Sequence, residues 1–162
     1  MSNPNNGKNI NQAGKQDRQI LERLQQNCRL PIAEIGEQIG MSTSACHRRI
    51  KLLEDSGFIE GYNARLNPKK LGYSIIVLVE ITLSSQSKPA LSRFEKAVEQ
   101  ADEILECYLM AGEADYLLTV AARGLEDFER LHREVIGRLP GVSGVKSNMI
   151  LRTVKDWHGY KL

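Results

Sequence analysis

The stretch that decides the fold of the first half of the chain covers residues 31–57 and reads PIAEIGEQIGMSTSACHRRIKLLEDSG. Pro31 suits the first turn of a helix, and the spacing of Ile35 and Ile39 predicts that a short helix follows it. Gly40 breaks this helix, and the hydroxyl of Ser42 can cap the next one. Two helices this short are unstable alone. They are therefore expected to cross and pack together as a helix-turn-helix.

The second helix of this pair is predicted to have a buried stripe and a polar face. Cys46, Ile50 and Leu53 lie at the helical spacing i, i+4, i+7. Small hydroxyls let the start of such a helix approach closely, an arginine fork suits guanine O6 and N7, and a lysine suits phosphate. Residue types alone fit an ordinary solvated face as well, but the helix-turn-helix spacing favours DNA. The predicted DNA contacts on this helix and its cap are Ser42, Thr43, Ser44, His47, Arg48, Arg49 and Lys51.

The segments on either side complete a predicted winged helix-turn-helix domain over residues 17–66. A first helix starting near Asp17 offers a stripe of Ile20, Leu21 and Leu24 for the other two helices to pack against. The apolar and aromatic residues of 58–66 (FIEGYNARL) predict a tight β-hairpin, or wing. Two polar segments flank this domain: residues 1–16 are expected to form a flexible arm, and residues 67–72 a linker.

The second half is predicted to be an α+β domain over residues 73–155. Strands are expected at 74–83, 104–111, 116–122 and 142–151, and helices at 91–101 and 128–139. The order β-α-β-β-α-β is that of a ferredoxin-like fold, with both helices on one face of the sheet. An identical partner is the simplest cover for the other face. Residues 156–162 are left as a C-terminal tail.

Composition and charge limit the function further. The longest apolar run has five residues (75–79), against roughly 20 for a membrane span, and no apolar leader is visible. Three scattered cysteines indicate reduced thiols, so a cytoplasmic protein without a membrane partner is expected. Residues 1–72 carry a net charge of +4 and residues 73–162 a net charge of −2. Only the first half is thus suited to a polyanion.

Two other classes of protein deserve comparison. Small ferredoxin-like dimers include isomerases and monooxygenases, but the sequence offers no nucleophile–base pair, glycine-rich phosphate loop or metal-ligand spacing. We therefore expect no enzyme activity, catalytic residue, metal or cofactor. A ferredoxin-like sheet can also bind RNA by stacking bases on aromatic side chains, but residues 116–120 hold only one aromatic residue. Salt-sensitive binding to duplex DNA without turnover of a metabolite separates these classes.

The chain resembles the Lrp/AsnC family of bacterial and archaeal feast/famine transcription regulators over residues 17–155. The motifs that carry the resemblance fall in both halves: AEIG (33–36), IGMS (39–42), RI (49–50), LE (53–54), GFI (57–59), VEITL (79–83), GEADYLL (112–118) and LPGV (139–142). Two independent sets of motifs, in order and without large gaps, make the resemblance specific. It implies a DNA-binding transcriptional regulator whose second domain senses a ligand.

The resemblance also implies an assembly and an effector site. Members of the family form dimers through the sheet domain, and often tetramers, octamers or a sixteen-mer, with a pocket between dimers that usually takes an amino acid. The Gly-x-x-Asp motif of the family matches Gly112 and Asp115, where a glycine turn can expose N–H groups to a carboxylate and the aspartate can meet an ammonium. Without the resemblance to the family, a plain hairpin turn is the simpler interpretation of residues 112–115. The other pocket positions that the resemblance implies are Leu109, Leu125, Asn148, Met149 and Ile150.

Overall fold

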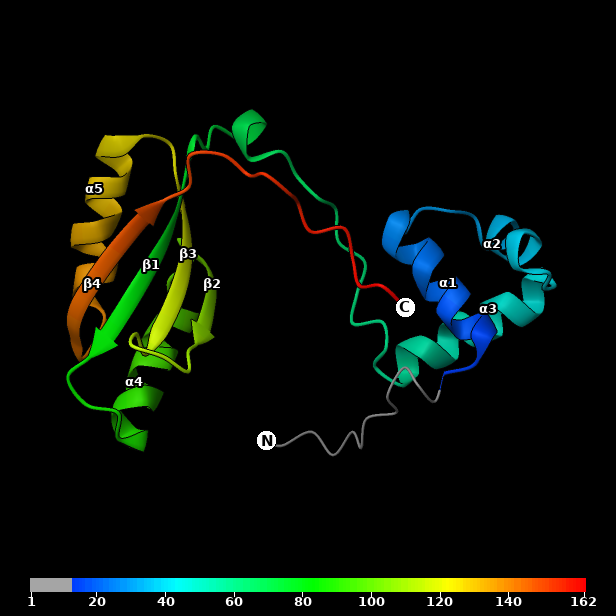
Figure 1. Cartoon of the computed structure of the whole chain (residues 1–162), viewed down its shortest axis with the longest axis horizontal. Helices are drawn as coiled ribbons and strands as arrows, with labels where there is room; N and C mark the ends of the chain where they lie inside the picture. Colours follow the sequence, from blue (N-terminus) through cyan, green and yellow to red (C-terminus); the bar gives the residue numbers. More distant parts are fainter. Residues whose placement is uncertain (1–12) are drawn as a thin grey trace. The chain divides into compact units, whose positions relative to one another are not determined.

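The computed structural model describes residues 13–162, which form two compact units (Figure 1). The helical unit comprises residues 13–65 together with 155–162, and the sheet unit comprises residues 66–154. Most of the predicted N-terminal arm lies outside the described residues. No helix within residues 13–162 is long and apolar enough to span a bilayer.

The helical unit contains the three predicted helices, α1 (Lys15–Gln26), α2 (Ile32–Ile39) and α3 (Thr43–Asp55). Each helix contributes its predicted apolar stripe to one core, because a short helix gains stability mainly by burying such a face. The buried members of this core are Ile20, Leu21, Ile35, Cys46, Ile50 and Leu53. The core predicted from helical spacing is therefore confirmed.

The turn between α2 and α3 depends on two glycines. Gly40 ends α2 in the left-handed region with φ of 70°, and Ser42 Oγ accepts a hydrogen bond from the Ala45 N–H at 3.2 Å. Gly36 packs so closely on the turn that a Cβ there would lie 2.8 Å from the Met41 carbonyl oxygen. The predicted break and the predicted cap are both confirmed.

The predicted β-hairpin over residues 58–66 is wrong, since no strand forms in this segment. The backbone N–H groups of Phe58 and Ile59 both donate to the Leu53 carbonyl, and their side chains pack against the helical core. Gly61 lacks the positive φ that a two-residue hairpin turn requires, and a two-stranded hairpin without further strands is marginal in water. The segment is consequently extended and exposed after Ile59.

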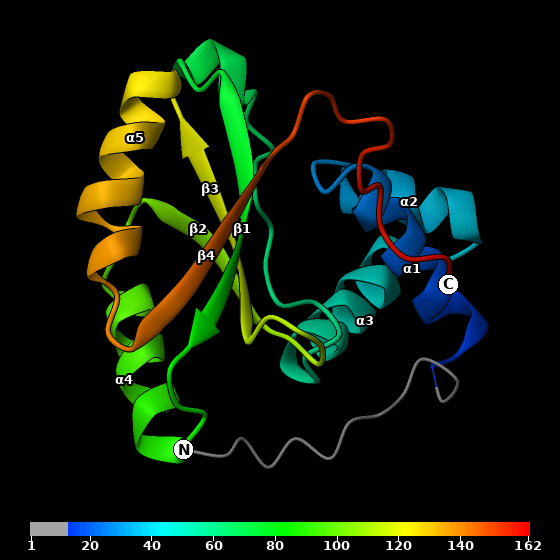
Figure 2. The same cartoon turned by 60° about the vertical axis from the view of Figure 1, so that its left-hand side comes forward.

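The sheet unit has the predicted β-α-β-β-α-β order, with two short 3-10 helices at Pro68–Leu71 and Ile136–Arg138 (Figure 2). Its four strands are antiparallel in the order β2-β3-β1-β4. Its regular elements are β1 (Ile75–Leu83), α4 (Lys88–Glu99), β2 (Ile104–Leu109), β3 (Tyr116–Ala122), α5 (Leu125–Glu134) and β4 (Val142–Met149). The core between sheet and helices takes alternate residues of β1 and β3, because successive strand residues point to opposite faces. Phe94 of α4 and Phe128 of α5 close it.

The opposite face of the sheet is only partly buried. It carries Leu78 and Glu80 of β1, and the strand register places Leu117 of β3 and Lys146 of β4 on either side of Glu80. Glu80 binds Lys146 Nζ at 3.3 Å and accepts a hydrogen bond from Asn148 at 2.9 Å. This face, here called the open face, therefore combines apolar side chains with a central charged cluster.

Candidate nucleic-acid interface and effector site

The start and the outer face of α3 present most of the predicted DNA contacts. Ser42, Thr43 and Ser44 are exposed around the capped N-terminus, and His47 and Arg48 are exposed one turn further on. The cap satisfies the Ala45 N–H and fixes the direction of the first turn. A helix with an exposed, capped start and an arginine beyond it has the form that enters a major groove.

Lys51 lies on the same side but already has partners. Its ammonium pairs with Asp55 at 3.1 Å and Glu54 at 3.9 Å, and the hydrogen bond with Asp55 is the main cause of a raised Lys51 pKa. Such exposed pairs contribute little stability, so exchanging a carboxylate for a phosphate costs little. Lys51 is thus suited to a non-specific contact with phosphate.

Arg49 differs from the other predicted contacts. Its guanidinium binds Asp17 of α1 through two hydrogen bonds, Nε to Oδ1 at 2.6 Å and Nη2 to Oδ2 at 2.9 Å. The bidentate bond raises the Arg49 pKa and ties α3 to α1. A DNA contact at Arg49 stays a prediction, and the donors left for it are those that the pair with Asp17 does not use.

A shallow cavity of about 220 Å³ runs along one side of α3. Two of its lining residues are joined, since the Tyr62 hydroxyl donates a hydrogen bond to Glu54 at 2.9 Å. Partial burial together with this bond raises the pKa of Tyr62 to about 12. Sequence reasoning missed Tyr62, because no spacing in the sequence points to a contact across a segment without regular structure. The lining residues are Cys28, Ile32, His47, Ile50, Lys51, Glu54 and Tyr62.

Asp115 has a structural environment that the sequence did not indicate. Its carboxylate is buried and accepts hydrogen bonds from the Leu83 N–H and from Gln86 Nε2, each at 2.7 Å. These bonds hold the end of β1 and the loop after it. A contact between Asp115 and a ligand's ammonium stays a prediction, since each carboxylate oxygen can accept a second hydrogen bond beside the one it already has.

Gly112 is exposed, and its φ is not in the left-handed region. A Cβ at this position would meet no atom of the chain within 4 Å. The backbone at Gly112 is therefore open, as the approach of a carboxylate to its N–H groups would require, and the effector contact there stays a prediction.

The predicted effector residues fall into two groups at opposite ends of the sheet. Leu109 pairs with Tyr116, which pairs with Ile81, so Leu109 lies with Gly112 and Asp115 at one end. At the other end, Met149 pairs with Val77, and α5 begins just after β3 ends. The four residues of that second group are Leu125, Asn148, Met149 and Ile150, and all are exposed. One chain does not bring the two groups together.

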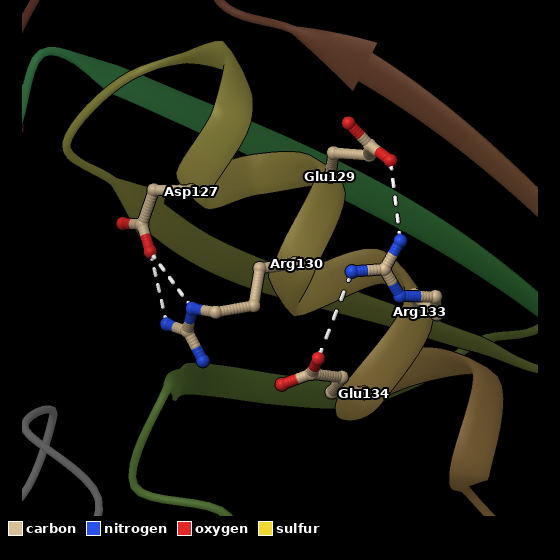
Figure 3. Close-up of polar contacts among 5 residues, drawn as sticks. All are labelled: Asp127, Glu129, Arg130, Arg133 and Glu134. Carbon is tan, nitrogen blue, oxygen red and sulfur yellow. Dashed lines mark hydrogen bonds and ion pairs between the residues drawn. The ribbon is translucent and has the colours of Figure 1, made fainter.

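The outer face of α5 is strongly charged but internally neutralised (Figure 3). Arg130 binds Asp127 at 2.9 Å, and Arg133 binds Glu129 at 3.3 Å. The Arg123 backbone N–H and Arg130 lower the pKa of Asp127. A cavity of about 380 Å³ at Asp127 and Arg130 contains none of the predicted site residues. These i, i+3 and i, i+4 pairs are typical of a solvated helix face.

The helix-turn-helix with its exposed third helix, followed by a separate α+β unit, defines a class of DNA-binding regulator. Comparison with family models gives two matches, a winged helix-turn-helix DNA-binding domain over residues 15–60 and an Lrp/AsnC ligand binding domain over residues 76–159. The chain belongs to the Lrp/AsnC family of transcription regulators.

Curated relatives and solved structures agree with this assignment. The chain is 38% identical to the leucine-responsive regulatory protein of Escherichia coli over 140 residues, 86% of this chain and 85% of that protein. It is 45% identical over 117 residues to an uncharacterized HTH-type transcriptional regulator of Sinorhizobium fredii, covering 72% and 92% of the two chains. A Neisseria meningitidis transcriptional regulator solved with L-methionine superposes with a TM-score of 0.84 at 31% identity, covering 88% and 92%.

Proposed function

We propose that this chain binds duplex DNA through α3 and changes its DNA binding when an amino acid binds the sheet unit. The observation that carries the DNA contact is the capped, exposed start of α3, with Ser44, His47 and Arg48 presented together. Arg48 is the proposed reader of a base, and Lys51 is the proposed phosphate contact. Arg49 is proposed to act mainly by joining α3 to α1, because Asp17 holds one edge of its guanidinium.

The proposed assembly is a homodimer through the open face, with dimers joining further into tetramers or octamers. Half-buried apolar side chains such as Ile76, Leu78 and Leu117 favour a covered face. A dimer also fits DNA reading, since two recognition helices related by a two-fold axis contact half-sites about one helical turn apart.

The proposed effector is an amino acid, bound between copies of the chain. L-Methionine occupies the Neisseria regulator, and the E. coli relative is named for its response to leucine. The residues at opposite ends of the sheet require a second copy if they are to line one pocket. In this proposal Asp115 shapes the loop beside the ligand, and Gly112 offers open backbone there.

We also infer that the chain works without catalysis, metal or cofactor, in the cytoplasm. Among residues 13–162, no group of three or more His, Cys, Asp or Glu side chains is placed to hold a metal ion. Turnover of an amino acid by the purified protein is the result that contradicts this inference.

Two substitutions on α3 test the DNA contact. Arg48→Ala should weaken specific binding by about 1–3 kcal/mol, because a lost bidentate base contact costs that much. Lys51→Ala should weaken binding to all sequences evenly and flatten the salt dependence. Arg29→Ala, an exposed arginine outside α3, is the matched control. Operator binding equal to wild type in both α3 variants, measured on folded protein, means that another surface reads DNA.

A thermal-shift screen against the twenty amino acids tests the effector. A ligand that binds only the native state raises the unfolding temperature. Calorimetry on the hits then gives the affinity. The absence of any shift, with the protein intact and assembled, refutes an amino-acid effector.

A further inference from the structure

The last eight residues of the chain dock on the helical unit instead of forming a loose tail. The side-chain amide of Gln25 on α1 pairs with the backbone of Tyr160, donating from Nε2 to the carbonyl at 3.1 Å and accepting the N–H at 2.6 Å. This double hydrogen bond imitates the pairing between two strands. Figures 1 and 2 both show the C-terminus ending beside α1.

Two more contacts hold the same segment. Leu162 packs against the helical core, and Arg65 Nη2 lies 2.6 Å from Asp156 Oδ1. The contacts are thus an amide pair, an apolar side chain and an ion pair, spread over seven residues. A segment held at three points is ordered more strongly than any one exposed contact would order it.

Gly159 is adapted to this docking. Its φ of +100° belongs to a region that other residues rarely adopt. A Cβ at this position would lie 2.6 Å from Gln25 Oε1 and 2.9 Å from Gln25 Cδ. The group that would have to move is therefore the same amide that holds Tyr160. A side chain at position 159 therefore weakens the pair between Gln25 and Tyr160 in two ways: it strains the backbone at positive φ, and its Cβ displaces the Gln25 amide.

The docked segment follows the predicted effector residues at the end of β4. The Ile150 N–H donates to the Ile76 carbonyl at 2.9 Å, so the chain leaves the sheet next to the start of β1. The helical unit therefore has two attachments to neighbouring strands, one through residues 66–74 and one through residues 151–154. Four residues span at most about 14 Å, which makes the second attachment short. It begins at the predicted effector residues Asn148, Met149 and Ile150.

We propose that residues 155–162 are a strap that transmits effector binding from the end of β4 to the DNA-binding helices. A second, short attachment restricts the positions that the helical unit can take. In a dimer, once the α3 of one copy is bound to DNA, this restriction sets the effective concentration of the other copy's α3 at its half-site. An effector that displaces residues 148–150 favours either the docked or the undocked state of the strap, and thereby changes the affinity for DNA. The inference rests on the proposed function, because it needs an effector at the end of β4.

The test uses the full chain with Gln25→Ala and Gly159→Ala, which break the amide pair in two different ways. Gln26→Ala is the matched control, since Gln26 is the exposed neighbour on the same helix. The first measurement is hydrogen exchange at the Tyr160 amide. It should be protected in wild type and in Gln26→Ala, and should exchange at least roughly tenfold faster in the two strap variants. Exchange at the rate of an exposed loop in wild type overturns the proposal.

The second measurement is the ratio of DNA affinities with and without a saturating amino acid, using L-methionine and L-leucine as probes. The ratio should fall towards one in Gln25→Ala and Gly159→Ala, while calorimetry still detects the amino acid binding to protein without DNA. If both variants keep the wild-type ratio of DNA affinities despite fast exchange at Tyr160, the strap is only a stabilising contact, and the proposed coupling is overturned. A ratio of one in wild type, with these two probes and with every amino acid that the thermal-shift screen finds to bind, refutes the proposed function instead and removes the coupling with it.

Discussion

Replacing Asp115 with alanine should destabilise the sheet unit, rather than selectively abolish the response to an effector. The carboxylate is buried and accepts two short hydrogen bonds, from the Leu83 N–H and from Gln86. A hydrogen bond to a charged group contributes about 1.5–3 kcal/mol, and a buried donor left without a partner costs about 1–3 kcal/mol. Because Gln86 can turn towards water and the Leu83 N–H cannot, we expect a loss of about 2–4 kcal/mol.

Differential scanning calorimetry of the full chain measures this loss. For a unit of this size, 1 kcal/mol shifts the unfolding midpoint by about 4–8 °C, so Asp115→Ala should lower the midpoint of the sheet unit by roughly 10–25 °C. Asp115→Asn should lose less, because its remaining carbonyl oxygen can still accept the Leu83 N–H. Glu113→Ala, an exposed carboxylate in the same loop, is the control and should change little. A midpoint equal to that of Glu113→Ala would falsify the structural role of Asp115.

Three further predictions concern other parts of the chain. Arg49→Ala should destabilise the helical unit by about 1 kcal/mol in urea unfolding, because the bidentate pair with α1 is lost, whereas Arg48→Ala should not. The folded pKa of Tyr62 is raised to about 12, so its contribution to stability is complete below pH 10 and is lost as the pH rises towards 12. The absorbance difference between wild type and Tyr62→Phe should titrate near pH 12, not pH 10. Leu117→Glu places a second carboxylate opposite Glu80 on the open face, and sedimentation should then detect a monomer; an unchanged oligomer means that another surface joins the copies.

The sequence by itself determined the helices, the strands and most of the core. The stripe of Cys46, Ile50 and Leu53 and the alternation in β3 are periodic, and period alone decides which face is buried. The Ser42 cap and the break at Gly40 were also predictable, since each depends on a local backbone conformation.

Tertiary structure alone decided what individual polar groups do. Arg49 is adjacent to Arg48, but it binds Asp17 on another helix, 32 residues away in sequence. Asp115 accepts hydrogen bonds from the end of β1 and from the loop after it, about 30 residues away in sequence. The periodicity of a sequence cannot show such partners, because a hydrogen bond depends on distance and direction, and here the donor and acceptor lie on elements far apart in the sequence.

The two irregular segments of the helical unit also show what periodicity cannot predict. The expected hairpin after α3 is absent because Phe58 and Ile59 are drawn into the helical core, and burial outweighs a marginal two-stranded pairing. The C-terminal residues contain no periodic signal, yet Tyr160 binds Gln25 of α1 and Leu162 packs against the helical core. Local patterns fix which segments become helices and strands, whereas the folded surface of the helical unit decides where the irregular segments bind.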